Sequence, residues 1–310
     1  MLVIFLSVVL AVAIAMDLLF GEPPEAIHPV VYFGKVISVL DPLLRKIRPK
    51  TLSGGAFLVL VALIGLAPFV IILHFSRIFI LLDIFVSAYL LKSTFAIRSM
   101  IDHINRVLAP LELGNMDEAK SELAMLVRRP VDNLSEGEIC SACVESMSEG
   151  LVDGFIGPLF YYPFFGVLGS LFYRIINTLD SNVGYKDRKN IKFGKASAVA
   201  DSALNYIPAR FSSLVITVSA ALLSLKGFLP HLSDIATTDS PNAGWPMSTA
   251  ASFLNVRLEK VGHYVINEEK PFPSIKDVRT SIKLYVISCA VFVFLWVLPA
   301  MAIMSVIGGL

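Results

Sequence analysis

Residues 284–310 form an apolar run without one charged side chain. A helix needs about 20 mostly apolar residues to cross the hydrocarbon core of a bilayer, so this run is long enough for a membrane span. Only 16% of the residues of the chain are charged, against about a quarter in a soluble domain. The chain is therefore predicted to be an all-α, polytopic helical membrane protein. Further largely apolar segments occupy residues 1–16, 55–76, 78–97, 155–173 and 207–225.

Residues 1–16 admit two interpretations. Ala13-Ile14-Ala15 resembles the small-residue cleavage site of a secretory signal peptide. A signal peptide also needs basic residues ahead of its apolar core, and none is present here. We therefore expect residues 1–16 to be a retained helix.

Basic residues are unevenly distributed along the chain. They gather in residues 35–50, 98–129, 174–195 and 226–283, whereas the turn between the second and third apolar segments carries only Arg77. Because Lys and Arg accumulate in cytoplasmic loops, these four stretches are predicted to be polar cytoplasmic loops, with both termini outside. The chain is accordingly expected to be a multi-pass protein of the cell membrane, with residues 1–310 forming a single membrane-embedded domain.

This orientation has a consequence for the crossings. The segments 1–16, 55–76, 78–97 and 284–310 are expected to cross the bilayer, one after another along the chain. The segments 155–173 and 207–225 must then return to the side from which they came, as re-entrant or broken helices. Such backbone is tolerated at membrane depth only where protein or a cavity shields it. The alternative is that one or both of them cross fully.

Several functional classes lack their signatures in this chain. A net charge of +1 gives no general attraction to nucleic acid, so no nucleic-acid partner is expected. Neither a P-loop nor a G-x-G-x-x-G dinucleotide motif is present. The pair Cys140 and Cys143 lacks the further ligands of a zinc site, so both are expected to be buried thiols.

Three carboxylates, Glu145, Glu149 and Asp153, follow one another at four-residue spacing. On a helix they lie on one face, where like charges repel each other. A divalent cation would relieve this repulsion, and Mg²⁺ prefers carboxylate oxygens. This spacing favours a Mg²⁺ or substrate site, with an exposed acidic stripe as the alternative.

Other polar side chains concentrate beside the apolar segments, where ionisable groups are costly and usually functional. An Arg or Lys suits phosphate and an Asp suits a metal ion, but an ordinary polar helix end or an interfacial anchor would use the same residue types. These stretches contain Asp17, Glu22 and His28; Arg174, Asn177, Asp180 and Lys186; Asp201, Asn205 and Arg210; and Ser240, Asn242 and Trp245.

Taken in order, these stretches resemble the adenosylcobinamide-phosphate synthase family. The resemblance rests on Phe20-Gly-Glu-Pro-Pro with His28-Pro29, on Leu126-Val-Arg-Arg129, and on Glu145-Ser with Glu149 and Asp153. It continues through Asn177-Thr-Leu-Asp180, Ile207-Pro-Ala-Arg210 and Ser240-Pro-Asn-Ala-Gly-Trp-Pro246. The chain departs from the family pattern at Gly150, Ser202, Asp239 and Met247, which weakens any role assigned at those positions.

The resemblance implies an ATP-dependent ligase of cobalamin biosynthesis that forms a carbon–nitrogen amide bond. It would join adenosylcobyric acid, a corrinoid, to aminopropanol phosphate or a related amino alcohol, using ATP and Mg²⁺. Other corrinoid-pathway membrane enzymes are possible partners. The main alternative is a membrane transporter or permease, and the third is a structural or sensory subunit. The residues implied are, for catalysis, Glu145, Glu149, Asp153, Asp180 and Asn242; for metal binding, Glu145, Glu149 and Asp153; and for substrate or phosphate binding, Arg129, Arg174, Asn177, Lys186, Asn205, Arg210, Ser240 and Trp245.

Overall fold

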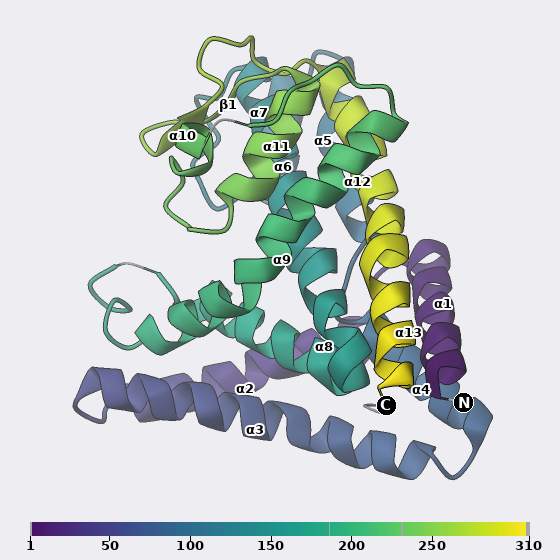
Figure 1. Ribbon diagram of the computed structural model, residues 1–310. Coiled ribbons are helices and arrows are strands. Elements are labelled where there is room, and N and C mark those ends of the chain that lie inside the picture. The colour runs from purple at the N-terminus through teal and green to yellow at the C-terminus, as the bar shows by residue number, and fades with distance from the viewer. Residues whose placement is uncertain (1, 186, 231, 308–310) are drawn as a thin grey trace. The chain divides into compact units, whose positions relative to one another are not determined.

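A computed structural model describes residues 2–185, 187–230 and 232–307. Helices form almost all of the regular structure in these residues (Figure 1), and one antiparallel hairpin pairs Leu258 with Ile266. The all-α class predicted from the apolar segments is confirmed. The chain divides into two compact units, each assembled from separate stretches of sequence. The expectation that residues 1–310 form a single membrane-embedded domain stays a prediction.

Unit 1 consists of Met1–Ala96, Gly157–Asn205 and Trp296–Leu310. The N-terminal helix α1 packs against α4 and α13 (Figure 1). Helix α8 packs against α2, α3, α4 and α13 and so lies at the centre of the unit. Its helices are α1 (Leu2–Phe20), η1 (Glu25–Ile27), α2 (Pro29–Leu44), α3 (Lys50–Ser76), α4 (Ile80–Lys92), α8 (Gly157–Val183), the first part of α9 (Lys195–Leu222) and α13 (Leu298–Val306).

Unit 2 consists of Ile97–Ile156 and Tyr206–Leu295. Helix α7 is central and packs against α11, α12 and β1. Its start is fixed by a capping box in which Ser135 and Glu138 satisfy each other's backbone donors. The elements are α5 (Arg98–Glu112), α6 (Met116–Ala124), α7 (Glu136–Leu151), η2 (Val152–Ile156), the rest of α9, α10 (Leu232–Ile235), α11 (Gly244–Leu254), β1 (Leu258–Lys260), β2 (Tyr264–Ile266) and α12 (Ile275–Phe292), followed by the π-helical turn η3 (Val293–Val297) that leads back into α13.

Among the described residues, four helical stretches are long and apolar enough to cross a membrane: Val3–Phe20, Lys50–Ser76, Glu136–Val183 and Ile275–Val306. The expected crossing over residues 78–97 is not among them. Helix α4 has 13 residues and is therefore only about 20 Å long, against a hydrocarbon core of about 30 Å.

Helix α8 is broken in the apolar segment where the sequence predicts a re-entrant or broken helix. Gly166 has φ +59° and ψ −153°, which no helical residue adopts. Pro163, three residues earlier, lacks the N–H that a continuous helix needs. The predicted break is confirmed at Gly166, and it bends the polypeptide inside unit 1.

Candidate functional site

Unit 1 contains a polar cluster that we call the α8–α9 cluster: Tyr173, Arg174, Asn177 and Asp180 from α8, and Asp201 and Asn205 from α9. The residues at 173, 177 and 180 recur at helical spacing and share one face of α8. Those at 201 and 205 are one turn apart on α9. The polar faces of α8 and α9 thus meet inside unit 1, where most of the buried side chains are apolar.

Hydrogen bonds fix the centre of the α8–α9 cluster. Asn177 Nδ2 donates to Asp201 Oδ1, and Asn205 Nδ2 donates to Asp201 Oδ2, each over 3.2 Å. The Tyr173 hydroxyl donates to Asn205 Oδ1 over 2.7 Å. Because Asn177 and Asn205 are both buried, these bonds hold the carboxylate plane of Asp201 in one orientation.

Asp180 brings a second carboxylate close enough to Asp201 for their charges to interact. Its Oδ1 is buried without a hydrogen-bond partner among the described residues. Burial raises the pKa of the Asp201 carboxyl above its ordinary value, although the bonds from Asn177 and Asn205 act in the opposite direction. Asp180 and Asp201 are both half-buried, and two carboxylates that repel each other favour a cation between them.

Two neighbours complete this region. Arg174 donates from Nη1 to Asn177 Oδ1 over 3.4 Å, so its guanidinium contacts the same side chain that binds Asp201. Gly184 lies against Asp180, where a Cβ would come within 1.8 Å of Asp180 Oδ1. Any larger residue at 184 would therefore displace the Asp180 side chain. Lys186, predicted to bind phosphate, lies outside the described residues.

Glu145 is the centre of a second polar cluster, in unit 2. Tyr264 donates to Glu145 Oε2 over 2.8 Å, and Ser141 donates to Oε1 over 2.8 Å. The guanidinium of Arg129 pairs with the same carboxylate at 3.3 Å. Both charged side chains are largely buried, with 12% of Arg129 and 7% of Glu145 exposed. Glu145 is thus fully engaged by protein partners.

The other two carboxylates of the predicted ladder lie in different surroundings. Glu149 is exposed, and Asp153 is half-buried in the π-helical turn η2, which changes the helical phase after Leu151. Within the described parts of the chain, no three His, Cys, Asp or Glu side chains form a group able to hold a metal ion. This geometry does not fit a Mg²⁺ site made of Glu145, Glu149 and Asp153, and Arg129 neutralises Glu145 rather than facing a free pocket.

Arg210 organises a third polar group in unit 2. Its guanidinium lies 3.5 Å from the ring centroid of Tyr206 and 5.0 Å from that of Trp245. It donates to the Tyr206 carbonyl oxygen over 2.7 Å and to Asn242 Oδ1 over 3.4 Å. Ser240 accepts from the backbone N–H of Asn242. The structure therefore brings the predicted residues Arg210, Ser240, Asn242 and Trp245 together.

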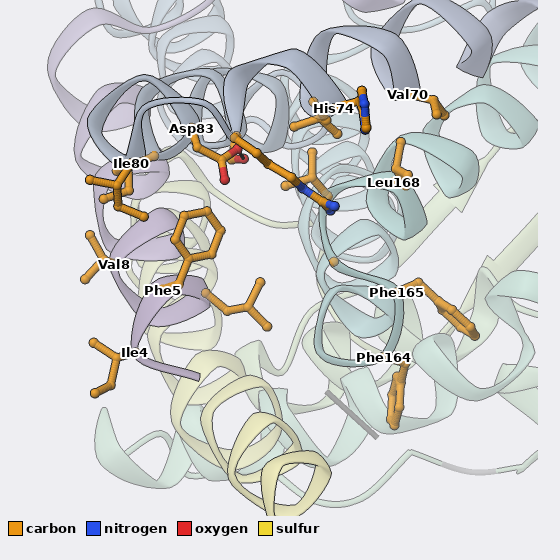
Figure 2. Close-up of a pocket in the computed structure, with 17 residues that line it drawn as sticks. Ile4, Phe5, Val8, Val70, His74, Ile80, Asp83, Phe164, Phe165 and Leu168 are labelled. Carbon is orange, nitrogen blue, oxygen red and sulfur yellow. Dashed lines mark hydrogen bonds between the residues drawn. The ribbon is translucent and has the colours of Figure 1, made fainter. Parts of the chain in front are cut away.

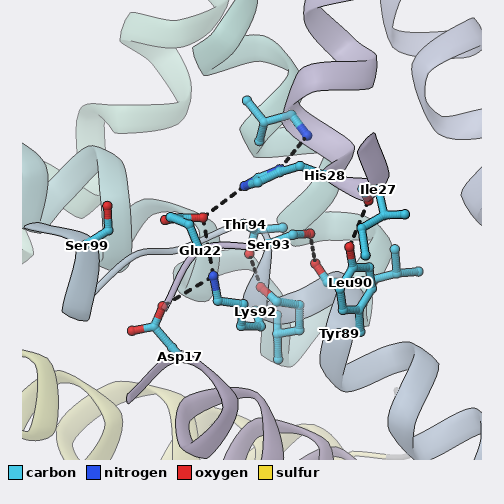
Figure 3. A network of polar contacts seen from close by, with 12 residues as sticks. Asp17, Glu22, Ile27, His28, Tyr89, Leu90, Lys92, Ser93, Thr94 and Ser99 are labelled. Carbon is cyan, nitrogen blue, oxygen red and sulfur yellow. Dashed lines mark hydrogen bonds and ion pairs between the residues drawn. The ribbon is translucent and has the colours of Figure 1, made fainter. Parts of the chain in front are cut away.

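Unit 1 also contains an ion-pair network around the buried Lys92, to which the sequence assigns no role (Figure 3). Lys92, only 2% exposed, lies 3.6 Å from Asp17 and 3.3 Å from Glu22. His28 accepts the Val30 N–H at Nδ1, so its Nε2 carries the proton that it donates to Glu22 over 2.9 Å. A lysine in an apolar segment was the available signal, because such a charge needs buried partners.

The cysteines behave as the sequence predicts. Cys140, Cys143 and Cys289 are all buried.

Comparison with known proteins decides the family. A family model described as "CobD/Cbib protein" matches residues 10–294 of the chain. The chain belongs to the CobD/Cbib family. The resemblance to the adenosylcobinamide-phosphate synthase family is thereby confirmed, and the matched range contains every candidate residue described above.

Several CobD relatives are similar over most of their length. "Probable cobalamin biosynthesis protein CobD" of Thermoplasma volcanium is 44% identical over 300 residues, which are 96% of this chain and 99% of that protein. "Cobalamin biosynthesis protein CobD" of Dehalococcoides mccartyi is 38% identical over 83% of this chain and 85% of its own length. The protein of Methanocaldococcus jannaschii with the same name as the first is 30% identical over 93% and 98% of the two chains. No solved structure matches this CobD/Cbib chain.

Proposed function

We propose that this protein is an enzyme of cobalamin biosynthesis that forms adenosylcobinamide phosphate in the cell membrane, as a multi-pass protein. It would join a carboxyl group of adenosylcobyric acid to the amine of aminopropanol phosphate, or of a related amino alcohol, at the expense of ATP. Membership of the CobD/Cbib family supports the pathway, and its relatives are named cobalamin biosynthesis proteins. The amide ligation itself is our proposal.

The observation that carries this proposal is the meeting of Asp180 and Asp201 in the α8–α9 cluster. Mg²⁺ is usually held by one or two carboxylates while substrate phosphates and water complete its shell. The Asp180 Oδ1, which has no hydrogen-bond partner among the described residues, and the oriented Asp201 carboxylate fit that requirement. When bound with ATP, Mg²⁺ would neutralise phosphate charge as the carboxyl group is activated.

The remaining residues of the α8–α9 cluster would position these groups. Arg174 contacts Asn177, and a guanidinium can donate two parallel hydrogen bonds to phosphate oxygens. Asn177 and Asn205 would hold Asp201 in place, and Tyr173 would hold Asn205. In the ligation, the amine nitrogen bonds to the activated carboxyl carbon, and the carboxyl oxygen leaves with the phosphoryl or adenylyl group.

The Glu145 cluster and the Arg210 group receive positioning roles in this proposal. Glu145 is saturated by Arg129, Ser141 and Tyr264, so it supports the fold of unit 2 rather than binding Mg²⁺. Arg210 would orient the loop that carries Asn242 and Trp245.

The decisive experiment is a reconstitution. Purified protein in lipid nanodiscs is incubated with adenosylcobyric acid, aminopropanol phosphate, ATP and Mg²⁺, and the amide product is identified by mass. We expect product only when all four components are present, with ADP or AMP formed in equal amount. If no amide forms and the protein instead takes up a corrinoid into proteoliposomes without ATP, the ligase hypothesis is rejected and the transporter alternative is supported.

A further inference from the structure

Unit 1 contains a cavity of about 1020 Å³ that no residue of the three polar clusters or of the Lys92 network lines (Figure 2). Its walls come from the start of α1, the end of α3, the start of α4 and the broken part of α8 around Gly166. Residues 164–168, which include the non-helical Gly166, form one wall of this space. Irregular backbone at membrane depth is expected where it lines a cavity.

The cavity opens onto an apolar surface of the unit. Its lining residues Ile4 and Phe165 are 70% and 68% exposed. The neighbouring helix α3 and the turn after it expose Ile71, Phe75 and Phe79. An exposed apolar surface of this kind suits contact with lipid chains.

One end of the cavity is polar. Figure 2 shows His74 and Asp83 at that end, and Ile4 and Phe164 at the other. Asp83 accepts hydrogen bonds from Ser76 over 2.7 Å and from Ser87 over 3.3 Å, both through Oδ1. Arg77, the C-cap residue that follows α3, lines the same space.

Arg77 and Asp83 have opposite charges but form no ion pair with each other, and no other carboxylate of the described residues pairs with Arg77. A guanidinium and a carboxylate held apart at the mouth of an apolar cavity match a ligand with both charges. The guanidinium suits a phosphate, and the carboxylate suits an ammonium group.

We propose that this cavity binds one membrane phospholipid with a zwitterionic headgroup of the phosphoethanolamine type. Arg77 holds the phosphate, Asp83 receives the ammonium group, and a hydrocarbon chain lies between α1 and the broken part of α8. The site is separate from the α8–α9 cluster and from the Lys92 network, none of whose residues line it. The binding is therefore independent of the proposed ligase activity.

The test is native mass spectrometry of the full chain released from nanodiscs of equal phosphatidylethanolamine and phosphatidylglycerol. We expect one phosphatidylethanolamine to be retained in preference to phosphatidylglycerol. Arg77→Gln should lower this retention roughly tenfold or more, the size expected for a lost charge-assisted hydrogen bond. Asp83→Asn should leave total lipid retention high and remove the preference for phosphatidylethanolamine.

Two further variants test the hydrocarbon part. Val8→Trp fills the cavity and should reduce retention of both lipids. Val59→Trp is its control. Val59 is also an apolar residue of unit 1, is 52% exposed and does not line the cavity. Lys46→Gln, at an exposed position outside the cavity, is the control for Arg77→Gln.

Equal retention by the wild-type protein, Arg77→Gln and Val8→Trp would mean that only loosely associated lipid is detected, and would overturn the proposal. Displacement of the lipid by glycerophosphoethanolamine at similar concentration would also overturn it, because a free headgroup would then suffice without a hydrocarbon chain.

Discussion

The side-chain amide of Asn177 donates a 3.2 Å hydrogen bond to the carboxylate of Asp201, 24 residues further along the chain. This bond joins the polar face of α8 to that of α9. It leaves Asp201 beside Asp180, whose Oδ1 has no hydrogen-bond partner among the described residues. The pair of carboxylates is the part of the α8–α9 cluster on which activity should depend most strongly.

Asp180→Asn and Asp201→Asn should each lower the rate of amide formation by on the order of 100-fold, because each removes a charge that would hold Mg²⁺ in the proposed site. The rate is measured by mass detection of the product at several Mg²⁺ concentrations, and the Mg²⁺ requirement should rise in both variants. Asp117→Asn, at an exposed position in unit 2, is the control and should match the wild-type protein. Unchanged Mg²⁺ dependence in both variants would remove these residues from the metal site.

Arg210→Lys should lower activity about tenfold although it keeps the charge, because Lys cannot reproduce the planar stacking on Tyr206 and Trp245. The ring of Trp245 should become more exposed to solvent. Its fluorescence emission, measured in a Trp296→Phe background, reports this change. Arg98→Lys is the control, since Arg98 forms an exposed pair with Asp102. A wild-type rate in Arg210→Lys would show that the guanidinium serves only as an interfacial anchor.

Glu145→Gln should destabilise the protein by about 3 kcal/mol, because it leaves the buried charge of Arg129 without its partner. Thermal unfolding in detergent measures the effect. Glu149→Gln, at an exposed side chain, should leave the unfolding temperature unchanged. Added Mg²⁺ should not restore the stability of Glu145→Gln, and restoration would return the carboxylate ladder to the role of a metal site.

The Lys92 network should make stability depend on pH in acid. Burial alone would raise the pKa of Glu22, but hydrogen bonds and charge from His28 and Lys92 outweigh it and lower that pKa below its ordinary value of 4.5. A lowered folded-state pKa means that the stabilisation is fully present above pH 4.5 and is lost as the pH falls through the folded-state pKa.

The variant Glu22→Gln tests this assignment by comparison with the wild-type protein. The difference in unfolding temperature between the two should be largest above about pH 5 and should shrink at lower pH. A difference that stays constant across this range would show that Glu22 contributes packing rather than charge.

Gly166→Ala should destabilise unit 1 by about 1–3 kcal/mol, since φ +59° with ψ −153° is accessible almost only to glycine. Gly34→Ala is the matched control. Gly34 lies inside α2, and a Cβ there would meet no atom within 4 Å, so the control should be neutral or slightly stabilising. Thermal unfolding of both variants measures the effect. Equal unfolding temperatures would mean that α8 can straighten at residue 166.

The sequence by itself determined the membrane class, the helical content and the family, because these depend on the length of apolar runs and on the order of local motifs. It also predicted the break in α8, since Pro163 and Gly166 act on their own backbone. Arg174, Asn177 and Asp180 could be selected together because they lie within two turns of one helix.

Only the tertiary structure decided which distant residues meet. Asp201 joins Asn177, Lys92 joins Asp17 and Glu22, and Tyr264 joins Glu145, and each contact depends on the packing of elements far apart in the chain. Spacing alone made Glu145, Glu149 and Asp153 look equivalent. Burial and the π-helical turn at Val152–Ile156 give the three carboxylates different surroundings, because side-chain environment depends on what packs against a helix as well as on its period.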